Sequence, residues 1–406
     1  MISHKIPAKS TKKSLNLGLT LFIILIVVSY NSTGYTTVFD PGAFGVRPEG
    51  MAGAVVALPT DLISAFYYNP AGLAGIKGTN ATTGVFRLRG STKYKTDGYS
   101  KKNSLNPVLP YLAFSTDASN PVVLGVCTFS TIGTGVEFNN YPLNNRLIDI
   151  KSEIGLVSLN PTIAYKMNDR LSLGAEINIG YGVSEMKTPL VTPEAQGYLQ
   201  SDTDGFGFGV TLGLLYKITP SLSLGLSWRS SMETPLKGDF HLDGIKGDLD
   251  LDLYWPQMFL AGIGYNITPD LNLGLNIKWS DWSYFNKSEL KYKSILPHVP
   301  VTSGAEDTVR FQIGMEYFAT ESLALRCGYI YDPSAIKKEM ISPMLPDMDI
   351  NEFFAGIGLS FGKFLLDIGA NYGVWSTTRV SYSLTGFEGK YSGHRLGMGI
   401  EISYCW

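Results

Sequence analysis

The stretch Leu271-Asn272-Leu273-Gly274-Leu275-Asn276-Ile277-Lys278-Trp279 places an apolar side chain at every odd position and a small or polar one at every even position. Because successive side chains of a β-strand point to opposite faces, such a strand meets an apolar medium on one face and a polar medium on the other. The same alternation recurs at 171–181, 222–228 and 323–331. The chain is therefore predicted to be all-β.

Composition narrows the choice among all-β folds. Charged residues make up 17% of the 406 residues, below the roughly 25% that is usual for soluble proteins. No apolar run reaches the roughly 20 residues of a helical membrane span. A membrane β-barrel avoids such runs because it places its apolar residues at every second position. The composition therefore favours a transmembrane barrel.

Strand-like segments and connections alternate along most of the chain. Short connections, such as Thr219-Pro220 and Gly362-Lys363, alternate with long polar ones at 93–108, 131–153, 185–203, 233–253, 285–307, 334–350 and 377–392. This order is typical of a hairpin barrel with short periplasmic turns and long outer loops. Residues 79–406 are predicted to form an antiparallel barrel of about 14 strands: 80–92, 109–117, 121–130, 154–168, 170–184, 204–218, 221–232, 254–267, 270–284, 308–320, 322–333, 351–362, 364–376 and 393–406.

The first 34 residues are predicted to be a signal peptide. Four lysines between positions 5 and 13 precede an apolar run from Leu15 to Val28, and small or polar residues follow up to Gly34. Cleavage after Gly34 would remove the four lysines, so the formal charge would change from −2 to −6. A negative chain of this kind argues against a nucleic-acid partner.

The stretch Phe66-Tyr67-Tyr68-Asn69-Pro70-Ala71-Gly72-Leu73-Ala74 is too short and too interrupted by Pro70 and Gly72 to be a ladder strand. A run of small residues precedes it at 45–57. Residues 35–78 are therefore predicted to form a compact plug, or hatch, inside the barrel. The predicted hatch residues are Gly50, Gly53, Asn69, Pro70 and Ala71.

Charged residues fall on the strand face that would point into the barrel: Glu176, Arg229, Lys278, Arg310, Glu316, Arg326, Asp367 and Glu401. A water-filled pore and a plugged lumen would both accept them. Mixed charges favour a lumen filled by protein, because buried charges need partners. A ligand carboxylate would be bound by Arg or Lys. The candidates for its head group are Arg229, Lys278, Arg310 and Arg326, and we favour Arg326.

The sequence contains no pattern that predicts catalysis, a cofactor or a metal site. The three cysteines, Cys127, Cys327 and Cys405, have neither disulfide nor metal-ligand spacing, and no G-x-S-x-G elbow is present. The glycine-rich 205–209 lacks the helix of a phosphate loop, so it is interpreted as a strand with small inward residues. The aromatic segment 279–285 is interpreted as part of an interfacial girdle rather than as the lining of an apolar access groove.

Several of these motifs together resemble the FadL/TodX family of outer-membrane transporters for long-chain fatty acids and hydrophobic aromatic compounds. The similar segments are Gly50-x-x-Gly53 with Asn69-Pro70-Ala71, Leu226–Ser230 followed by Lys237–Phe240, Trp279–Phe285, and Leu325–Tyr329 followed by 343–349. Their order spans about residues 44 to 406. The resemblance implies a fourteen-strand barrel with a hatch, an internal apolar pocket, and release after the hatch rearranges, through a lateral gap in the wall.

We therefore expect a passive transporter of hydrophobic ligands in the bacterial outer membrane. The expected ligands are above all long-chain fatty acids, and aromatic hydrocarbons are the other ligand class. Its other expected partners are outer-membrane lipid and, during biogenesis, the barrel-assembly machinery, whose C-terminal signal the terminal Trp406 resembles. We expect a monomer. The alternatives are a barrel that serves as an assembly or secretion partner without transporting, and a general porin for small polar solutes.

Overall fold

The computed structural model describes residues 42–143, 146–191, 196–292, 298–302 and 304–406. The predicted signal peptide and the first part of the predicted hatch, residues 35–41, lie outside these residues. None of the helices in the described part of the chain is long and apolar enough to cross a membrane.

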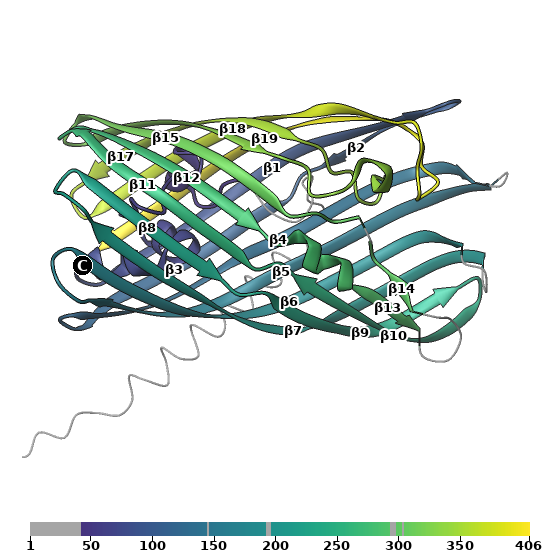
Figure 1. Cartoon of the computed structure of the whole chain (residues 1–406), viewed down its shortest axis with the longest axis horizontal. Coiled ribbons are helices and arrows are strands. Elements are labelled where there is room, and N and C mark those ends of the chain that lie inside the picture. The colour runs from purple at the N-terminus through teal and green to yellow at the C-terminus, as the bar shows by residue number, and fades with distance from the viewer. Residues whose placement is uncertain (1–41, 144–145, 192–195, 293–297, 303) are drawn as a thin grey trace, which may run out of the picture.

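Fourteen strands form a closed antiparallel barrel, in which β1 at one end of the chain pairs with β19 at the other (Figure 1). The prediction of an all-β barrel with fourteen strands is confirmed. The strands of the wall, in order around it, are β1 (Asn80–Thr96), β3 (Val108–Ser119), β4 (Val122–Leu143), β5 (Arg146–Lys166), β6 (Leu171–Val191), β7 (Gln196–Lys217), β8 (Leu222–Arg229), β11 (Met258–Thr268), β12 (Leu271–Ser280), β15 (Thr308–Thr320), β16 (Leu323–Asp332), β17 (Ile350–Phe361), β18 (Phe364–Val380) and β19 (Gly389–Cys405).

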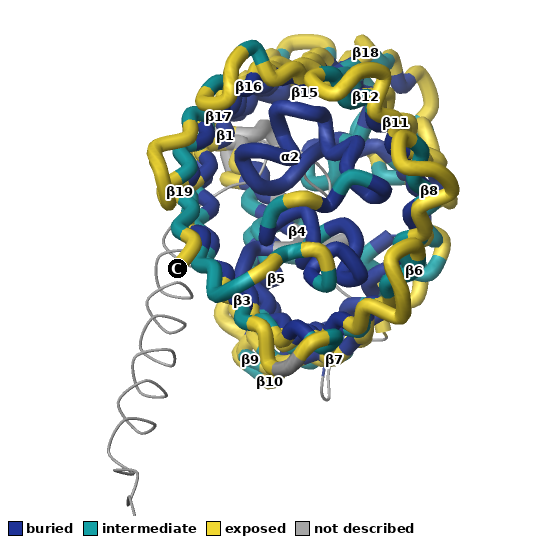
Figure 2. Tube along the Cα trace, turned by 90° about the vertical axis from the view of Figure 1, so that its left-hand side faces the viewer, coloured by how far each residue is buried: buried dark blue, intermediate teal, exposed yellow. Residues whose placement is uncertain are grey.

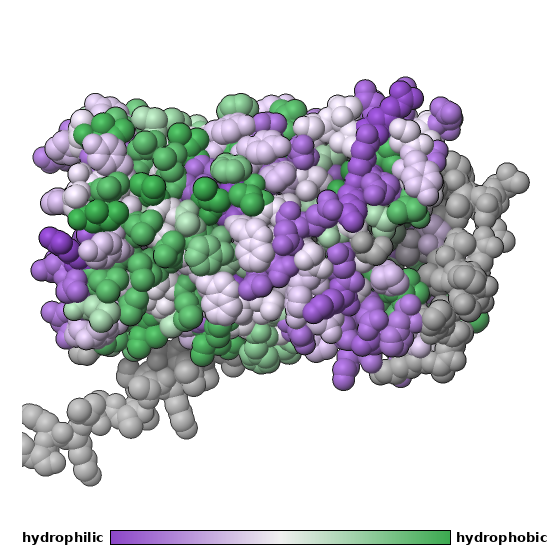
Figure 3. All heavy atoms as spheres, viewed as in Figure 1, coloured by the Kyte–Doolittle hydropathy of each residue, from purple (hydrophilic) through white to green (hydrophobic). Residues whose placement is uncertain are grey.

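The alternation in the sequence becomes the two faces of the wall. In β12, Leu275 and Ile277 are 42% and 49% exposed on the outside, whereas Asn276 and Lys278 are 3% and 6% exposed on the inside. Figure 3 shows the result on the face in view, where apolar residues gather on the half of the barrel next to the short turns. The other half has a hydrophilic surface, and we call it the extended end.

The extended end corrects the predicted loops. The connections predicted at 131–153 and 185–203 are mostly strand, because β4 and β5 continue to residues 143 and 146, and β6 and β7 to 191 and 196. The predicted loop 233–253 is the hairpin of β9 (Met232–Leu242) and β10 (Ile245–Trp255), and 93–108 contains β2 (Tyr99–Leu105). Pairing needs only backbone partners and an inner apolar face, so strands continue beyond the lipid with polar outer side chains.

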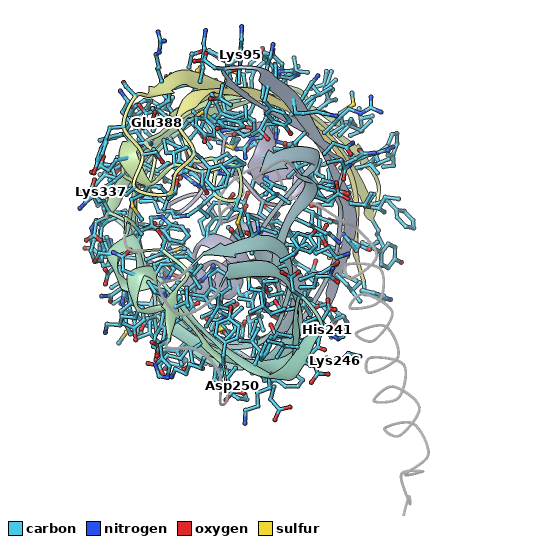
Figure 4. The ribbon with its side chains drawn as sticks, turned by 90° about the vertical axis from the view of Figure 1, so that its right-hand side faces the viewer. Lys95, His241, Lys246, Asp250, Lys337 and Glu388 are labelled. Carbon is cyan, nitrogen blue, oxygen red and sulfur yellow. The ribbon has the colours of Figure 1, made fainter. Side chains whose placement is uncertain are left out.

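Smaller elements complete the extended end. They are the short strands β13 (Glu289–Tyr292) and β14 (Val299–Pro300) and the 3-10 helices η3 (Trp282–Lys287) and η4 (Lys338–Met340). In β10 the side chains of Leu249, Leu251 and Leu253 are buried, while polar residues alternate with them. Figure 4 looks onto this end and shows Lys246 and Asp250 at its rim. The extended end is therefore apolar inside and charged outside.

Residues 42–78, here called the luminal segment, lie inside the barrel (Figure 2). The segment contains α2 (Val46–Gly50), the π-helical turn η1 (Ser64–Tyr68) and the 3-10 helix η2 (Pro70–Gly75). Most of its residues are buried. The chain then enters the wall, because β1 begins at Asn80, next to the predicted boundary at 78/79.

Candidate functional site

Asn69 connects the two halves of the luminal segment to each other and to the wall. Its side-chain oxygen caps η2 by accepting a hydrogen bond from the Ala71 amide at 3.2 Å. Its side-chain amide donates to the carbonyl oxygens of Val56 at 2.8 Å and Leu214 at 3.0 Å. Pro70 begins η2, where its missing N–H costs nothing. The Asn-Pro-Ala motif thus forms the point at which the segment folds back on itself.

A series of buried ion pairs fixes α2 to strands β15, β16 and β18 of the wall. Arg47 contacts Asp61 of the luminal segment at 2.6 Å and Glu316 of β15 at 2.8 Å. Arg326 of β16 contacts the same Glu316 at 2.7 Å and Asp367 of β18 at 2.5 Å. Each of these charges is almost completely removed from water, so each depends on its neighbours for compensation.

Further hydrogen bonds hold the rest of α2 and the turn after it. The Val46 amide donates to Glu401, which also accepts from the Tyr111 hydroxyl at 2.5 Å. The Asn276 side chain donates to the Gly53 carbonyl at 2.7 Å. Gly53 has a φ of +70°, which a side chain would oppose. The backbone of the segment is therefore bonded to several strands at once.

Glycines on the inner face of the wall let the luminal segment lie directly against the backbone of the strands. A Cβ on Gly328 would lie 2.8 Å from the Ala52 amide nitrogen, and one on Gly356 would lie 2.9 Å from the Cα of Gly50. We call the glycines with such close backbone neighbours in the segment the glycine belt: Gly174, Gly213, Gly225, Gly262, Gly264, Gly274, Gly314, Gly328, Gly356 and Gly369. Many of them pair across adjacent strands, as Gly274 does with Gly314.

The four predicted head-group residues all point inward but differ in what they contact. Arg229 donates to the Tyr67 carbonyl at 2.9 Å, and its guanidinium lies 5.0 Å from the Tyr67 ring centre. Arg310 donates to the Gly42 carbonyl at 3.1 Å and pairs with an aspartate of β16 at 2.6 Å. Lys278 is buried opposite Arg310 in the register. Arg326 lies between two carboxylates beneath the luminal segment.

The sequence reasoning missed several charged residues of the lumen. Arg47, Glu49 and Asp61 lie in the luminal segment, where no strand periodicity indicates a direction. Arg395 and Glu352 form a buried ion pair between β19 and β17. Arg395 could have been found, because it is an even number of residues from the inward Glu401 on the same strand and therefore points to the same face.

A large apolar cluster fills the inside of the extended end. It includes Met232, Leu236, Trp255 and Met258 from β9 to β11. Trp282 and Phe285 belong to it and are 5% and 0% exposed, so the girdle interpretation of 279–285 is wrong for these two residues. The strand ends at Ser280, and the three-residue period of η3 turns both rings inward.

The third strand of the wall leaves one of its neighbours part of the way along. β4 pairs with β5 along its whole length, from Val122 to Leu143. Its pairing with β3 covers only Val122 to Thr128. At Gly125 the ring of Phe66 from the luminal segment takes the space of a side chain, because a Cβ there would lie 2.6 Å from its Cζ. The ladder interruption and the luminal segment therefore meet on the same strand.

The loop between β16 and β17 has a carboxyl with an altered pKa. Asp347 accepts hydrogen bonds from the Ala335 amide at 2.5 Å and the Ser334 hydroxyl at 3.1 Å. Removal from water raises its pKa from the ordinary 3.8 to about 7, and the nearby Asp332 and Asp349 add to the rise.

We expect this loop to loosen with rising pH. Because the pKa of Asp347 in the folded loop lies above its ordinary value, its contribution to loop stability is complete below about pH 4 and is lost as the pH rises through about 7. Hydrogen exchange of the Ala335 amide, corrected for the intrinsic rate, should be up to about 30-fold faster at pH 8.5 than at pH 5.5, because the pH passes through a pKa of about 7. Asp347→Asn should abolish this dependence, and an unchanged slope in that variant would contradict the assignment.

The described residues contain no group of three or more His, Cys, Asp or Glu side chains able to hold a metal ion. A sequence model of the family described as "Outer membrane protein transport protein (OMPP1/FadL/TodX)" matches residues 38–405. This match confirms the resemblance found in the sequence.

Individual relatives agree with it. The chain is 25% identical to a long-chain fatty acid transport protein of Escherichia coli O6:H1 over 65% of this chain and 69% of the relative. It is 22% identical to one of Salmonella typhi over 73% and 76%. Among solved structures, its fold is similar to a Pseudomonas aeruginosa FadL homologue (TM-score 0.79, 17% identity, 92% of this chain and 100% of the other). It is also similar to the Pseudomonas putida toluene transporter TodX (TM-score 0.76, 18% identity, 91% and 100%). The chain therefore belongs to this family of transport proteins of the bacterial outer membrane, which are channels for hydrophobic molecules and not enzymes.

Proposed function

We propose that this protein carries long-chain fatty acids passively across the outer membrane, and that the luminal segment is a hatch that rearranges to release them. One observation carries the proposal. A buried apolar cluster lies inside the extended end, and next to it the lumen is filled by a segment that ion pairs hold to the wall. Relatives named as long-chain fatty acid transport proteins support the ligand class.

The physical chemistry of a fatty acid suits this arrangement. Burial of its chain contributes about 0.8 kcal/mol per methylene, so an apolar interior can concentrate it without an energy source. Its carboxylate needs a cation that is not already neutralised on both sides. Arg326, favoured from the sequence, touches Glu316 and Asp367, which would repel a third carboxylate.

Arg229 is the better head-group residue for this ligand. It is half-buried, and in the described structure it holds the carbonyl and the ring of Tyr67 in the luminal segment. A carboxylate that took over Arg229 would weaken this contact with η1. Arg229 would then take part both in ligand binding and in holding the hatch. Because the ligand would displace the contact with Tyr67, the hatch would open only when a ligand is bound.

Uptake by intact cells tests the function. Cells that lack any other transporter of this family should take up labelled oleate when they produce this protein, while the purified protein should give little ion conductance in planar bilayers. Steady large conductance without oleate uptake would instead indicate a porin. A protein that gives neither, but co-purifies with a stable protein partner, would indicate an assembly role.

Arg229→Gln should lower oleate uptake about tenfold, because a hydrogen bond to a charged group contributes roughly 1.5–3 kcal/mol. Arg170→Gln is the matched control, since Arg170 lies exposed in a short turn and should leave uptake unchanged. Uptake equal in both variants would remove Arg229 as the anchor.

A further inference from the structure

The outer face of β1 carries a row of positive charges that leads to the rim of the extended end. Arg87, Arg89, Lys93 and Lys95 are all exposed, whereas alternate side chains such as Leu88 are buried on the inside. Figure 4 shows Lys95 at the rim. One strand therefore presents four cations to the outside of the barrel.

Further cations lie directly opposite this row on the neighbouring strands. Lys95 is opposite Lys390 of β19, and Lys390 is opposite Arg379 of β18. Lys93 is opposite Lys102 of β2. These three neighbours are exposed, and together with the four cations of β1 we call them the cationic face. Like charges directly opposite each other destabilise a sheet, so the arrangement is unfavourable unless anions bind to it.

The protein does not supply these anions in the part of the chain that the structure describes. There, none of the seven cations forms an ion pair with a carboxylate. The carboxylates nearest in sequence, Asp97 and Glu388, are exposed and also lack such a pairing. Elsewhere at the extended end the outer cations are neutralised, as Lys151 is by Glu185 at 2.5 Å. The cationic face is therefore distinct from the rest of this surface.

The cationic face begins at the depth where the lipid-facing residues end. Arg87 and Arg89 are opposite Met398 and Leu396 of β19, which are 60% and 39% exposed. The Nε of Arg87 donates to the neutral side chain of Asn106 at 2.8 Å. Beyond Leu396, the outward residues of β19 are polar. The two arginines thus lie where the head groups of the outer leaflet meet the barrel.

The length of the row selects among anionic lipids. The eight residues from Arg87 to Lys95 cover about 27 Å along the strand at about 3.4 Å per residue, or about 20 Å along the barrel axis at a tilt of about 40°. The phosphate of a phospholipid lies at a single depth. Lipopolysaccharide carries phosphates on lipid A at the membrane surface and further phosphates on the inner-core sugars above it.

We propose that the cationic face is a binding site for lipopolysaccharide of the outer leaflet. Arg87 and Arg89 bind the lipid A phosphates, for which the guanidinium fork is suited, and the lysines further out bind the core phosphates as point charges. The bound phosphates also remove the repulsion between opposite cations. The inference goes beyond the proposed function and does not depend on what the barrel transports.

Binding of fluorescently labelled rough lipopolysaccharide to the purified protein in detergent tests the site. The variant Lys93→Gln, Lys95→Gln, Lys390→Gln should raise the Kd at least about tenfold, because each lysine near an anionic lipid surface contributes to the attraction. Its matched control is Lys246→Gln, Lys337→Gln, Lys338→Gln, which removes three exposed lysines elsewhere at the extended end and should leave the Kd unchanged. Equal Kd values for the two folded variants would overturn the proposal.

Two other lipids identify what is recognised. Lipopolysaccharide stripped of its phosphates, and phosphatidylglycerol, should each bind the unchanged protein at least about tenfold more weakly than intact lipopolysaccharide. Undiminished binding of the stripped lipid would mean that sugars or acyl chains are recognised, which would overturn the role of the cations. Phosphatidylglycerol that binds as tightly as lipopolysaccharide, and loses affinity in the same variant, would assign the surface to phospholipids instead.

A single substitution gives a second readout that does not depend on the triple variant. Without lipopolysaccharide, Lys390→Gln should unfold at the same temperature as the unchanged protein or a higher one, because it relieves repulsion with Lys95 and Arg379. The rise in unfolding temperature on adding lipopolysaccharide should fall to about half or less in this variant. A lower unfolding temperature without the lipid, together with an undiminished rise on adding it, would mean that Lys390 is structural and would refute the site.

Discussion

Replacing Gly274 with valine should unseat the luminal segment and make the barrel leak. A Cβ at this position would collide with the backbone carbonyl of Ala54, which cannot move without taking the segment with it. Overpacking of this kind costs about 1–3 kcal/mol, which corresponds to a roughly 5- to 150-fold larger population of barrels with the segment displaced. The strand itself tolerates valine well, so the barrel should still assemble.

Ion conductance in planar bilayers measures this effect directly. Gly155→Val is the matched control, because the nearest atom to a Cβ there, Val183 Cγ2, is at an ordinary 3.5 Å. The control should conduct as little as the unchanged protein, and Gly274→Val should show frequent, large openings. If Gly274→Val is folded and silent, the glycine belt is not what seats the segment.

The wall of this barrel could be predicted from the sequence because one local rule determines it. The odd residues of β12 face lipid and the even ones face the lumen, and both facts follow from a period of two. The same rule placed Glu316, Arg326 and Asp367 inside. The sequence shows the glycines of the belt as small inward residues. It does not show that they contact the backbone of the luminal segment.

The limits of the strands could not be predicted, since they depend on a change of solvent and not of backbone. β5 and β6 continue with Lys151 and Glu185 on their outer faces, and these two pair at 2.5 Å. A polar run of this kind resembles a loop when lipid is taken as the only medium outside the barrel. The interpretation of Trp282 was wrong for another reason, because the strand ends at Ser280 and a 3-10 helix begins at Trp282 itself.

The contents of the lumen were beyond sequence reasoning because its contacts join distant parts of the chain. Arg47 and Glu316 are 269 residues apart in sequence, and Asn69 reaches Leu214 across 145. No spacing rule connects such residues. Mixed inward charges indicated that something must neutralise them, but not that Arg47 of the luminal segment would be one of the partners of Glu316.

Arg47→Met should release the luminal segment even though it removes no atom from the wall. The substitution keeps most of the buried aliphatic volume and deletes the cation that compensates Asp61 and one side of Glu316. Removing one partner of a buried ion pair costs about 3–5 kcal/mol, because the remaining charge stays buried and uncompensated. Arg326 still holds Glu316, so the loss should fall mainly on Asp61 and on the seat of α2.

This destabilisation should increase the accessibility of the segment without unfolding the barrel. Arg47→Met should raise single-channel open probability about 100-fold or more, as a cost of 3 kcal/mol or more implies, while heat-modifiability on gels stays unchanged. Arg47→Lys keeps the charge but loses the bidentate contact. Its open probability should therefore lie between those of the unchanged protein and Arg47→Met. Arg170→Met, in an exposed turn, should not differ from the unchanged protein. Equal open probability in Arg47→Met and Arg170→Met would mean that the buried ion pairs do not hold the segment, and the glycine belt alone would then have to account for its seating.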